Sequence, residues 1–433
     1  MSLSIKELEA EILDQYFERN PRPWIIGFSG GKDSTMLLQV VWNALKNVSD
    51  APKNRDIYVV CNNTLVENPK IIEFTERTLN NIQEAASRQN LPFKVIRTIP
   101  RLEDSFWTNL IGKGYPAPTS TFRWCTERLK INPTTKFIKD KVDETGEVII
   151  LLGTRSDESA SRARSIQKHE VSGQRLRKHI LPNASVYTPI KDVCIDELWQ
   201  YLLQVKSPWG SDNKQLVTLY RNANSGDCPL VIDDTTPSCG NSRFGCWVCT
   251  VVNKDKSMEA LVNNGEDWLE PLLEVRELIL RYKENPEKRE NFRRNNLQGL
   301  GPYTEIARAE ILEKLLAAQN EIQETHPEIS LISYQELVAI QVLWYRDNHF
   351  TYNVADIYNR VSGSNITLNE ANNVITKEKE LLRNVCKTNK GDFELINELL
   401  ALQKTKTILM KNRGLQNDLE NHLDNYLRTK TII

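Results

Sequence analysis

A short apolar segment that leads into a glycine-rich string restricts the fold of this chain more than any other feature. Residues 24–28 are apolar and β-prone, and residues 29–34 read Ser-Gly-Gly-Lys-Asp-Ser. The apolar residues after this string recur at helical spacing: Met36, Leu37, Val40, Val41 and Leu45. The pattern predicts a strand, a glycine loop and a helix in direct succession.

Further apolar segments extend this pattern along the chain. Strands are predicted at residues 57–61, 93–96 and 148–152, with helical stretches between them. Continuous apolar strands that alternate with helices imply a parallel sheet covered by helices on both faces. We therefore predict an α/β domain over residues 1–255 and an α-helical C-terminal region over residues 256–433.

Composition and charge exclude several classes of protein. Hydrophobic residues make up 40% of the 433 residues and charged residues 26%, which is ordinary globular usage. The 56 Lys and Arg residues balance 57 Asp and Glu residues to a net charge of −1, so a nucleic-acid surface would have to be a local patch. The apolar runs are far shorter than the roughly 18 residues that span a bilayer, and the start of the chain does not resemble a signal peptide. We expect a cytoplasmic protein without membrane contact.

Residues 29–34 have the composition of an anion-binding loop. Backbone N–H groups of a glycine-rich turn at a helix N-terminus can converge on an anion, because no Cβ blocks the approach and the helix dipole favours negative charge. The string is not a Walker motif, which needs four residues between its first glycine and Gly-Lys. It resembles the PP-loop of the ATP pyrophosphatases, which cleave ATP between the α and β phosphates. An ordinary glycine-rich turn is the alternative.

The resemblance to a PP-loop implies a role for each residue of the string. The residues expected to bind ATP are Ser29, Gly30, Gly31, Lys32, Asp33 and Ser34. The loop amides and Lys32 would stabilise the departing pyrophosphate, on which negative charge develops. Asp33 would bind Mg²⁺, a hard cation that prefers oxygen ligands. The alternative for Asp33 is an acid that only complements the helix dipole.

A second string of polar residues, Gly-Thr-Arg-Ser-Asp-Glu-Ser, follows the predicted strand at 148–152. Ligands of open parallel sheets bind beyond the carboxyl ends of strands, so this string should face the same crevice as the glycine loop. It resembles an element of the sulfonucleotide reductase branch that contacts nucleotide and activated substrate. We expect Gly153 and Glu158 to contact the nucleotide, and Arg155 and Arg162 to clamp a second phosphate. A solvated basic face is the alternative.

Residues 123–130 form a third string, Arg-Trp-Cys-Thr-Glu-Arg-Leu-Lys. It resembles a basic, cysteine-containing helix that borders the substrate in the same family. Cys125 is therefore a candidate to accept or relay sulfur, and the alternative is that it only sits beside the nucleotide.

Half of the eight cysteines lie in one short segment, at Cys228, Cys239, Cys246 and Cys249. Four thiolates within reach of one another suit either tetrahedral Zn²⁺ or a [4Fe–4S] cluster. Zinc sites usually contain two short cysteine pairs, whereas this spacing contains a single C-x-x-C. The pattern favours [4Fe–4S], with Zn²⁺ as the alternative.

The three polar strings and the Gly-Cys-Trp-Val-Cys-Thr segment together resemble the DndC family, the sulfurtransferases of bacterial DNA phosphorothioation. The resemblance covers about residues 20 to 330. It implies an iron-sulfur ATP pyrophosphatase that helps to replace a non-bridging phosphate oxygen of DNA with sulfur. The implied partners are DNA, a cysteine desulfurase as the sulfur donor, and other proteins of the phosphorothioation pathway.

Three other functions compete with this one. A sulfonucleotide reductase would carry its nucleophilic cysteine in a Glu-Cys-Gly-x-His element, which does not occur in this sequence. A tRNA thiolation enzyme would have its cysteines arranged differently around the loop. A non-catalytic scaffold would not require Lys32 and Asp33, and an assay for pyrophosphate release would distinguish it from an enzyme.

Overall fold

The structure is a computed structural model that describes residues 4–48, 55–158, 160–169, 174–223, 245–293, 297–346 and 352–366, with a few more residues between 381 and 423. The chain divides into two compact units. The first comprises Met1–Pro100 and Arg123–Glu270, and the second comprises Arg101–Phe122 and Pro271–Ile433.

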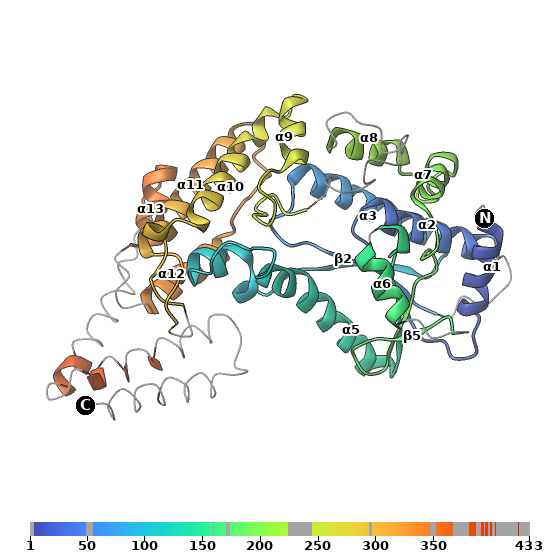
Figure 1. The fold of residues 1–433 in the computed structure, drawn as a ribbon, viewed down its shortest axis with the longest axis horizontal. Helices are drawn as coiled ribbons and strands as arrows, with labels where there is room; N and C mark the ends of the chain where they lie inside the picture. Colours follow the sequence, from blue (N-terminus) through green and yellow to red (C-terminus); the bar gives the residue numbers. More distant parts are fainter. Residues whose placement is uncertain are drawn as a thin grey trace. The chain divides into compact units, whose positions relative to one another are not determined.

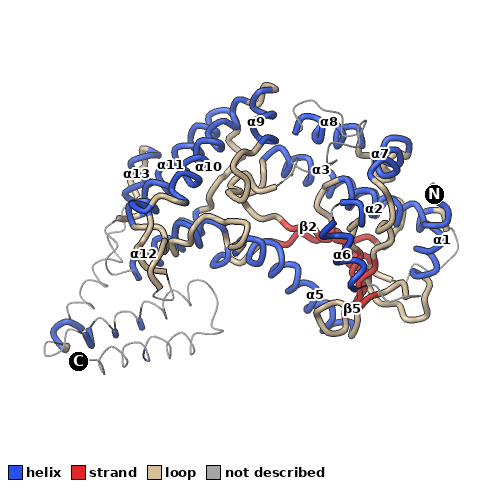
Figure 2. The backbone as a smooth tube through the Cα atoms, in the orientation of Figure 1, coloured by secondary structure: helices blue, strands red, loops and turns tan. Residues whose placement is uncertain are grey.

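The first unit is built on a six-stranded sheet of order β3-β2-β1-β4-β6-β5. Figure 1 shows the fold along the chain, and Figure 2 shows the strands of this sheet in red. The strands are β1 (Trp24–Gly27), β2 (Ile57–Asn62), β3 (Phe93–Thr98), β4 (Val148–Leu151), β5 (Arg177–Lys178) and β6 (Ala184–Tyr187). Neighbouring strands are parallel except β5 and β6, which pair antiparallel. The predicted α/β fold with a parallel sheet is confirmed.

Helices cover both faces of this sheet. Those of the first unit are α1 (Ile5–Tyr16), α2 (Lys32–Lys46), α3 (Pro69–Arg88), α4 (Trp124–Thr126), α5 (Asn132–Thr145), α6 (Ala160–His169), α7 (Ile195–Gln204), α8 (Asn213–Ala223) and α9 (Lys256–Asn263). Alternate residues of each central strand enter opposite cores, as the pleat requires. Ile26 and Val59 pack in the core under α1, α2, α3 and α7, whereas Ile25 and Val60 pack in the core under α5.

The order of the strands places a switch point in the middle of the sheet. Strand β1 pairs with β2 on one side and with β4 on the other, so the chain leaves β1 in one direction and later returns to its opposite side. Ligands of open α/β sheets bind at such a point, beyond the carboxyl ends of the strands. The glycine loop follows β1 and the string 153–158 follows β4, so both lie at this position.

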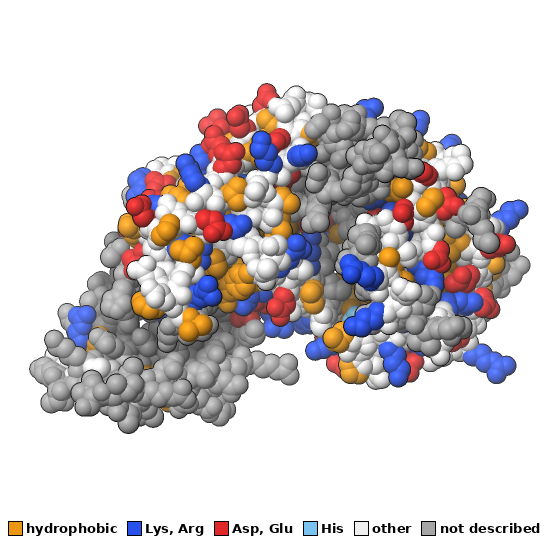
Figure 3. Space-filling view, in the orientation of Figure 1, with side chains coloured by type: hydrophobic (Ala, Val, Ile, Leu, Met, Phe, Trp, Pro, Cys, Tyr) orange, Lys and Arg blue, Asp and Glu red, His pale blue; other side chains and the backbone are white. Residues whose placement is uncertain are grey.

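The second unit is helical, as predicted for the C-terminal region. Its main elements are α10 (Glu270–Lys283), α11 (Glu305–Thr325), α12 (Tyr334–Arg346) and α13 (Val354–Ser362). None of the helices in the described part of the chain is long and apolar enough to cross a membrane. On the face drawn in Figure 3, acidic and basic side chains are interspersed, which matches the near-zero net charge.

The second unit also contains residues 101–122, which leave the first unit after β3 and rejoin it at Arg123. Phe106 and Trp107 of this segment are fully buried. The indole N–H of Trp107 donates to the Leu331 carbonyl at 2.7 Å, and that of Trp344 donates to the Ile111 carbonyl at 3.0 Å. A single boundary near residue 255 was predicted from the sequence, whereas the structure divides the chain at 100, 122 and 270.

Candidate functional site

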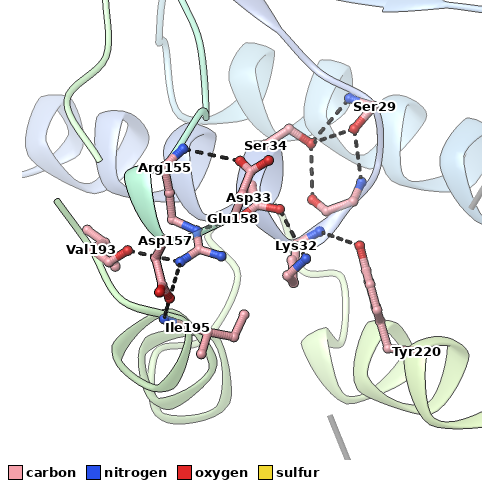
Figure 4. Close-up of polar contacts among 11 residues, drawn as sticks. Ser29, Lys32, Asp33, Ser34, Arg155, Asp157, Glu158, Val193, Ile195 and Tyr220 are labelled. Carbon is pink, nitrogen blue, oxygen red and sulfur yellow. Dashed lines mark hydrogen bonds and ion pairs between the residues drawn. The ribbon is translucent and has the colours of Figure 1, made fainter. Parts of the chain in front are cut away.

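The glycine loop is a tight turn whose backbone only glycine accommodates easily. Gly30 has φ of +73°, and a Cβ at this position would lie 2.6 Å from Oγ1 of Thr75 in α3. The Ser34 hydroxyl closes the turn from inside, because its Oγ accepts from the Ser29 N–H at 3.2 Å and donates to the Gly31 carbonyl at 3.0 Å (Figure 4). Gly31 is the N-cap of α2, so the amides of the first helical turn, which have no acceptor within the helix, face the loop.

The Asp33 carboxylate lies between two cations. The Arg155 Nε donates to Oδ1 at 2.6 Å, and the Lys32 Nζ lies 3.3 Å from Oδ2 (Figure 4). The Asp33 side chain remains 22% exposed, whereas that of Arg155 is 1% exposed. The site therefore holds one partly accessible carboxylate in a fixed orientation at the start of α2.

Arg155 has further partners in its own neighbourhood. Its Nη1 donates to the Val193 carbonyl at 2.9 Å and lies 3.5 Å from Asp157 Oδ2. Its backbone N–H donates to Glu158 Oε1 at 3.1 Å. We expected Arg155 to clamp a substrate phosphate and Glu158 to contact the nucleotide. In the structure the buried guanidinium orients Asp33, and Glu158 binds the backbone of its own turn.

The two strings are brought together by a close backbone approach. A Cβ on Gly153 would lie 2.8 Å from the backbone oxygen of Asp33, a separation that real Cβ atoms essentially never show. A glycine at the end of β4 therefore lets this loop pack directly on the first turn of α2. Arg162 lies in α6, and its side chain is outside the described residues.

The cysteine segment is described only in part, because Cys228 and Cys239 lie outside the described residues. Cys246 forms an isolated bridge with Glu67, and its Sγ lies 3.4 Å from the Thr64 hydroxyl. Burial raises the pKa of Cys246 to about 11, although the nearby positive charge of Lys130 opposes this shift. Within the described part of the chain, no three His, Cys, Asp or Glu side chains are placed to hold a metal ion.

Cys125 lies in the same neighbourhood as the C-x-x-C pair. Burial raises its pKa, and the charge of Cys249 raises it further. Lys130 faces the same group, with its Nζ 3.9 Å from Glu67 Oε1. Desolvation lowers the pKa of Lys130, but the neighbouring charges of Cys246, Glu67, Cys125 and Cys249 together outweigh it, and the net effect is a raised pKa. The Lys130 side chain remains 46% exposed, so a partly accessible ammonium group lies near these three thiols.

Sequence reasoning assigned no function to three residues that the structure places at these sites. Glu67 and Tyr220 belong to none of the strings described above, and Lys130 was noticed only as the last residue of the string at 123–130. Tyr220 contacts the glycine loop from α8 (Figure 4). The spacing of residues along the chain carried no signal for these contacts, because each of them joins segments that are distant in sequence.

The family model of the phosphoadenosine phosphosulfate reductase domain matches residues 23–252, which is more than half of the chain. The chain belongs to this family. The phosphoadenosine phosphosulfate reductase domain thus includes the glycine loop, the string after β4, Cys125 and the cysteine segment. It ends close to the point where the first structural unit ends.

One curated relative of this phosphoadenosine phosphosulfate reductase domain protein is similar over about half of the chain. An uncharacterized protein of Methanocaldococcus jannaschii is 31% identical over 233 residues, which are 54% of this chain and 37% of the relative. The chain thus spans little more than a third of that curated relative.

Two solved structures are similar to parts of the chain. The phosphoadenylyl-sulfate reductase of Candida auris is 12% identical, with a TM-score of 0.31, and the match covers 51% of this chain and 94% of that one. The U34-tRNA thiolase NcsA of Methanococcus maripaludis, solved with its [4Fe-4S] cluster, is 15% identical, with a TM-score of 0.30, and covers 72% of this chain and 88% of that one. Similarity at this level does not transfer a function.

Proposed function

We propose that the protein is an ATP pyrophosphatase and sulfurtransferase of DNA phosphorothioate modification. The observation that carries this proposal is the glycine loop with Lys32 and the oriented carboxylate of Asp33, at the switch point of the sheet. Membership of the phosphoadenosine phosphosulfate reductase domain family supports the handling of an adenine nucleotide and sulfur. The restriction to DNA rests on the resemblance of the combined sequence strings.

The first step activates a poor leaving group. A phosphate oxygen of DNA attacks the α-phosphorus of ATP, and the bond from that phosphorus towards the β-phosphate breaks, so that its electron pair leaves with pyrophosphate. The amides of Gly30, Gly31 and Ser34 and the ammonium of Lys32 stabilise the charge that develops on pyrophosphate. The adenylated oxygen of DNA then departs as AMP when a sulfur nucleophile attacks the DNA phosphorus.

Asp33 is the residue that would hold Mg²⁺. Its carboxylate is a hard oxygen donor, it remains partly accessible, and Arg155 fixes its orientation. Bound Mg²⁺ would neutralise phosphate charge. Lys32 contacts Oδ2, and this oxygen would become available to the metal when the ammonium turns to phosphate. Arg162 remains our candidate for the contact with the DNA phosphate.

The cysteine segment would supply the sulfur chemistry. Cys228, Cys239, Cys246 and Cys249 are the proposed ligands of a [4Fe–4S] cluster, and thiolates are the donors that such a cluster takes. Lys130 would offset part of the negative charge of these thiolates. Cys125, next to Cys249, is the candidate to carry sulfur from a cysteine desulfurase as a persulfide. A thiol reductant would then provide the two electrons that release the sulfur atom.

Pyrophosphate release tests the nucleotide chemistry. The purified protein with Mg²⁺, ATP and DNA, supplemented with the pathway partners, should form AMP and pyrophosphate, and Lys32→Ala should abolish this. Lys46→Ala is the matched control, because Lys46 is an exposed lysine in the last turn of the same helix. Formation of ADP and phosphate by the wild type would contradict the proposal.

Metal analysis after anaerobic purification tests the cluster. The wild type should contain iron and sulfide and have the brown colour of a [4Fe–4S] protein, and Cys246→Ala should lose both the metal and the colour. Cys194→Ala should keep both, because Cys194 is an exposed thiol outside the cysteine segment. Stoichiometric zinc without iron would favour the structural alternative.

Cys125→Ala separates the two roles proposed for thiols. We expect this variant to retain iron and sulfide but to lose sulfur transfer to DNA. Loss of the cluster in Cys125→Ala would instead make Cys125 one of its ligands.

A sulfonucleotide reductase is the second candidate, because the matching family model is named for that activity. Sulfite release from phosphoadenylyl sulfate with a dithiol reductant tests it directly. Turnover of that substrate without pyrophosphate release from ATP would favour this candidate over the first.

A further inference from the structure

The hydroxyl group of Tyr220 contacts the backbone of the glycine loop. Tyr220 lies in α8, and its oxygen accepts a hydrogen bond from the backbone N–H of Lys32 at 3.3 Å (Figure 4). A Cβ on Gly31 would lie only 3.2 Å from the same oxygen. The Lys32 ammonium lies 5.0 Å from the centroid of the Tyr220 ring, within the range of a cation–π contact. One phenol thus contacts both the amide and the side chain of Lys32.

The amide that Tyr220 engages belongs to the anion-binding part of the loop. Lys32 is the first residue of α2, so its N–H has no acceptor within the helix. Amides of this kind, at the positive end of the helix dipole, are the donors that bind phosphate oxygens. A neutral phenol oxygen is a weaker acceptor than a charged phosphate oxygen, because hydrogen bonds to ionised groups are roughly twice as strong.

Tyr220 is held in this position by packing. Its side chain is buried, and its ring meets the Trp199 ring of α7 edge to face at 5.3 Å. The region around the start of α8 is joined to α3 by hydrogen bonds from Arg77 to Gln215 at 2.9 Å and from Asn81 to Ser211 at 3.1 Å. The position of the phenol is therefore determined by the fold.

We propose that the Tyr220 hydroxyl takes the place of a phosphate oxygen at the Lys32 amide and is displaced from it when a phosphate-bearing ligand binds. The inference rests on the proposed function, since it takes the glycine loop as the phosphate site. Tyr220 thus competes with the ligand and lowers the affinity of the glycine loop for it. The benefit to the free protein is a satisfied donor at the start of α2.

Tyr220→Phe tests this competition, because it removes the hydroxyl and keeps the ring against Trp199 and Lys32. Binding is measured by calorimetry with three probes, namely pyrophosphate, the α,β-methylene analogue of ATP, and adenosine. We expect Tyr220→Phe to bind the two phosphate-bearing probes about three- to tenfold more tightly, the equivalent of one hydrogen bond. Its affinity for adenosine should equal that of the wild type.

Tyr201→Phe is the matched control. Tyr201 is another buried tyrosine, in α7, and its hydroxyl accepts from Asn43 of the same helix α2 at 3.2 Å, but Asn43 lies far from the loop along that helix. This variant should bind all three probes as the wild type does. A similar gain in Tyr201→Phe would show a general loosening of α2 and would overturn the inference.

The remaining outcomes are also decisive. Equal or weaker binding of pyrophosphate by Tyr220→Phe overturns the inference alone, provided that the wild type binds it. If the wild type binds neither pyrophosphate nor the ATP analogue, the proposed function and the inference fail together.

Discussion

At the scale of single residues, the ion pair between Asp33 and Arg155 could not be read from the motifs that contain them. Both residues were predicted at the site from their strings, and each was expected to face a ligand. The structure instead pairs them, with Arg155 buried and Asp33 partly accessible. The sequence could not show this pair, because 122 positions separate the two residues and only the sheet brings them together.

Replacement of Arg155 should destabilise the first unit. Arg155→Met keeps an apolar stem of similar length but leaves Asp33 without its 2.6 Å partner and the Val193 carbonyl without its donor. We expect a loss of about 2 to 3 kcal/mol in the free energy of unfolding, measured by urea denaturation. Arg175→Met should cost less than about 1 kcal/mol, because Arg175 makes ion pairs with Glu11 and Asp14 at the surface. Equal effects of the two substitutions would show that the Asp33 pair contributes little.

The thiol of Cys61 should show a clear dependence on pH. Burial raises its pKa to about 12, so the folded protein keeps this thiol neutral under ordinary conditions. Iodoacetamide at pH 8 should modify the exposed Cys194 and spare Cys61 until urea unfolds the chain, as read by mass spectrometry. Because the pKa of this thiol is higher in the folded protein than in the unfolded chain, burial of the neutral thiol contributes its full stabilisation below the unfolded pKa of about 8.5. This contribution is lost as the pH rises towards 12. Rapid modification of Cys61 in the native protein would contradict its burial.

At the scale of elements, the first four strands were predictable and the last two were not. Strands β1, β2 and β4 are apolar runs, since helices cover both of their faces, whereas the edge strand β3 was predicted from the shorter apolar pattern at residues 93–96. Strand β5 has only two residues, Arg177 and Lys178, and its edge position requires no apolar run. The contact between the loops after β1 and β4 was expected from the topology, but the need for glycine at position 153 was not.

Gly153→Ala should separate these two loops. Its Cβ would meet the backbone of Asp33 at 2.8 Å, which has no flexible end that can move aside. We expect at least a tenfold weaker affinity for ATP and a loss of about 1 to 3 kcal/mol in stability, the usual cost of overpacking. Calorimetry and urea unfolding measure the two effects.

Gly27→Ala is the matched control for this substitution. Gly27 is the last residue of β1 and lies, like Gly153, at the carboxyl ends of the strands. A Cβ on Gly27 would lie 3.5 Å from a Leu152 methyl group, which is an ordinary contact. If Gly153→Ala and Gly27→Ala behave alike, the close approach of the two loops does not determine ATP affinity.

At the scale of the whole molecule, the division into units was the least predictable property. Residues 101–122 are apolar and aromatic in part, and nothing in their sequence indicates which unit buries them. Their assignment follows from long-range contacts, such as those of Trp107 with Leu331 and of Arg308 with Ile111. The C-terminal region was predicted to be helical, but the sequence did not indicate that residues 101–122 belong to the same unit.

Truncation after residue 270 should therefore expose apolar side chains of residues 101–122. A fragment 1–270 retains the segment 101–122 but lacks the helices that bury Phe106 and Trp107. We expect this fragment to bind the dye ANS and to aggregate. A second fragment, in which residues 102–121 are replaced by a Gly-Ser linker, should remain monomeric and fold with the circular dichroism of an α/β protein. Equal aggregation of both fragments would mean that another surface is responsible.

The burial of residues 101–122 in the second unit also affects folding during translation. Trp107 cannot form its hydrogen bond until Leu331 has been synthesised, 224 residues later. At translation rates of roughly 5 to 20 residues per second, the wait lasts roughly 10 to 45 s. During this interval the aromatic segment has left the ribosome without the helices that bury it. The nascent chain therefore exposes a defined apolar stretch until the second unit has been synthesised.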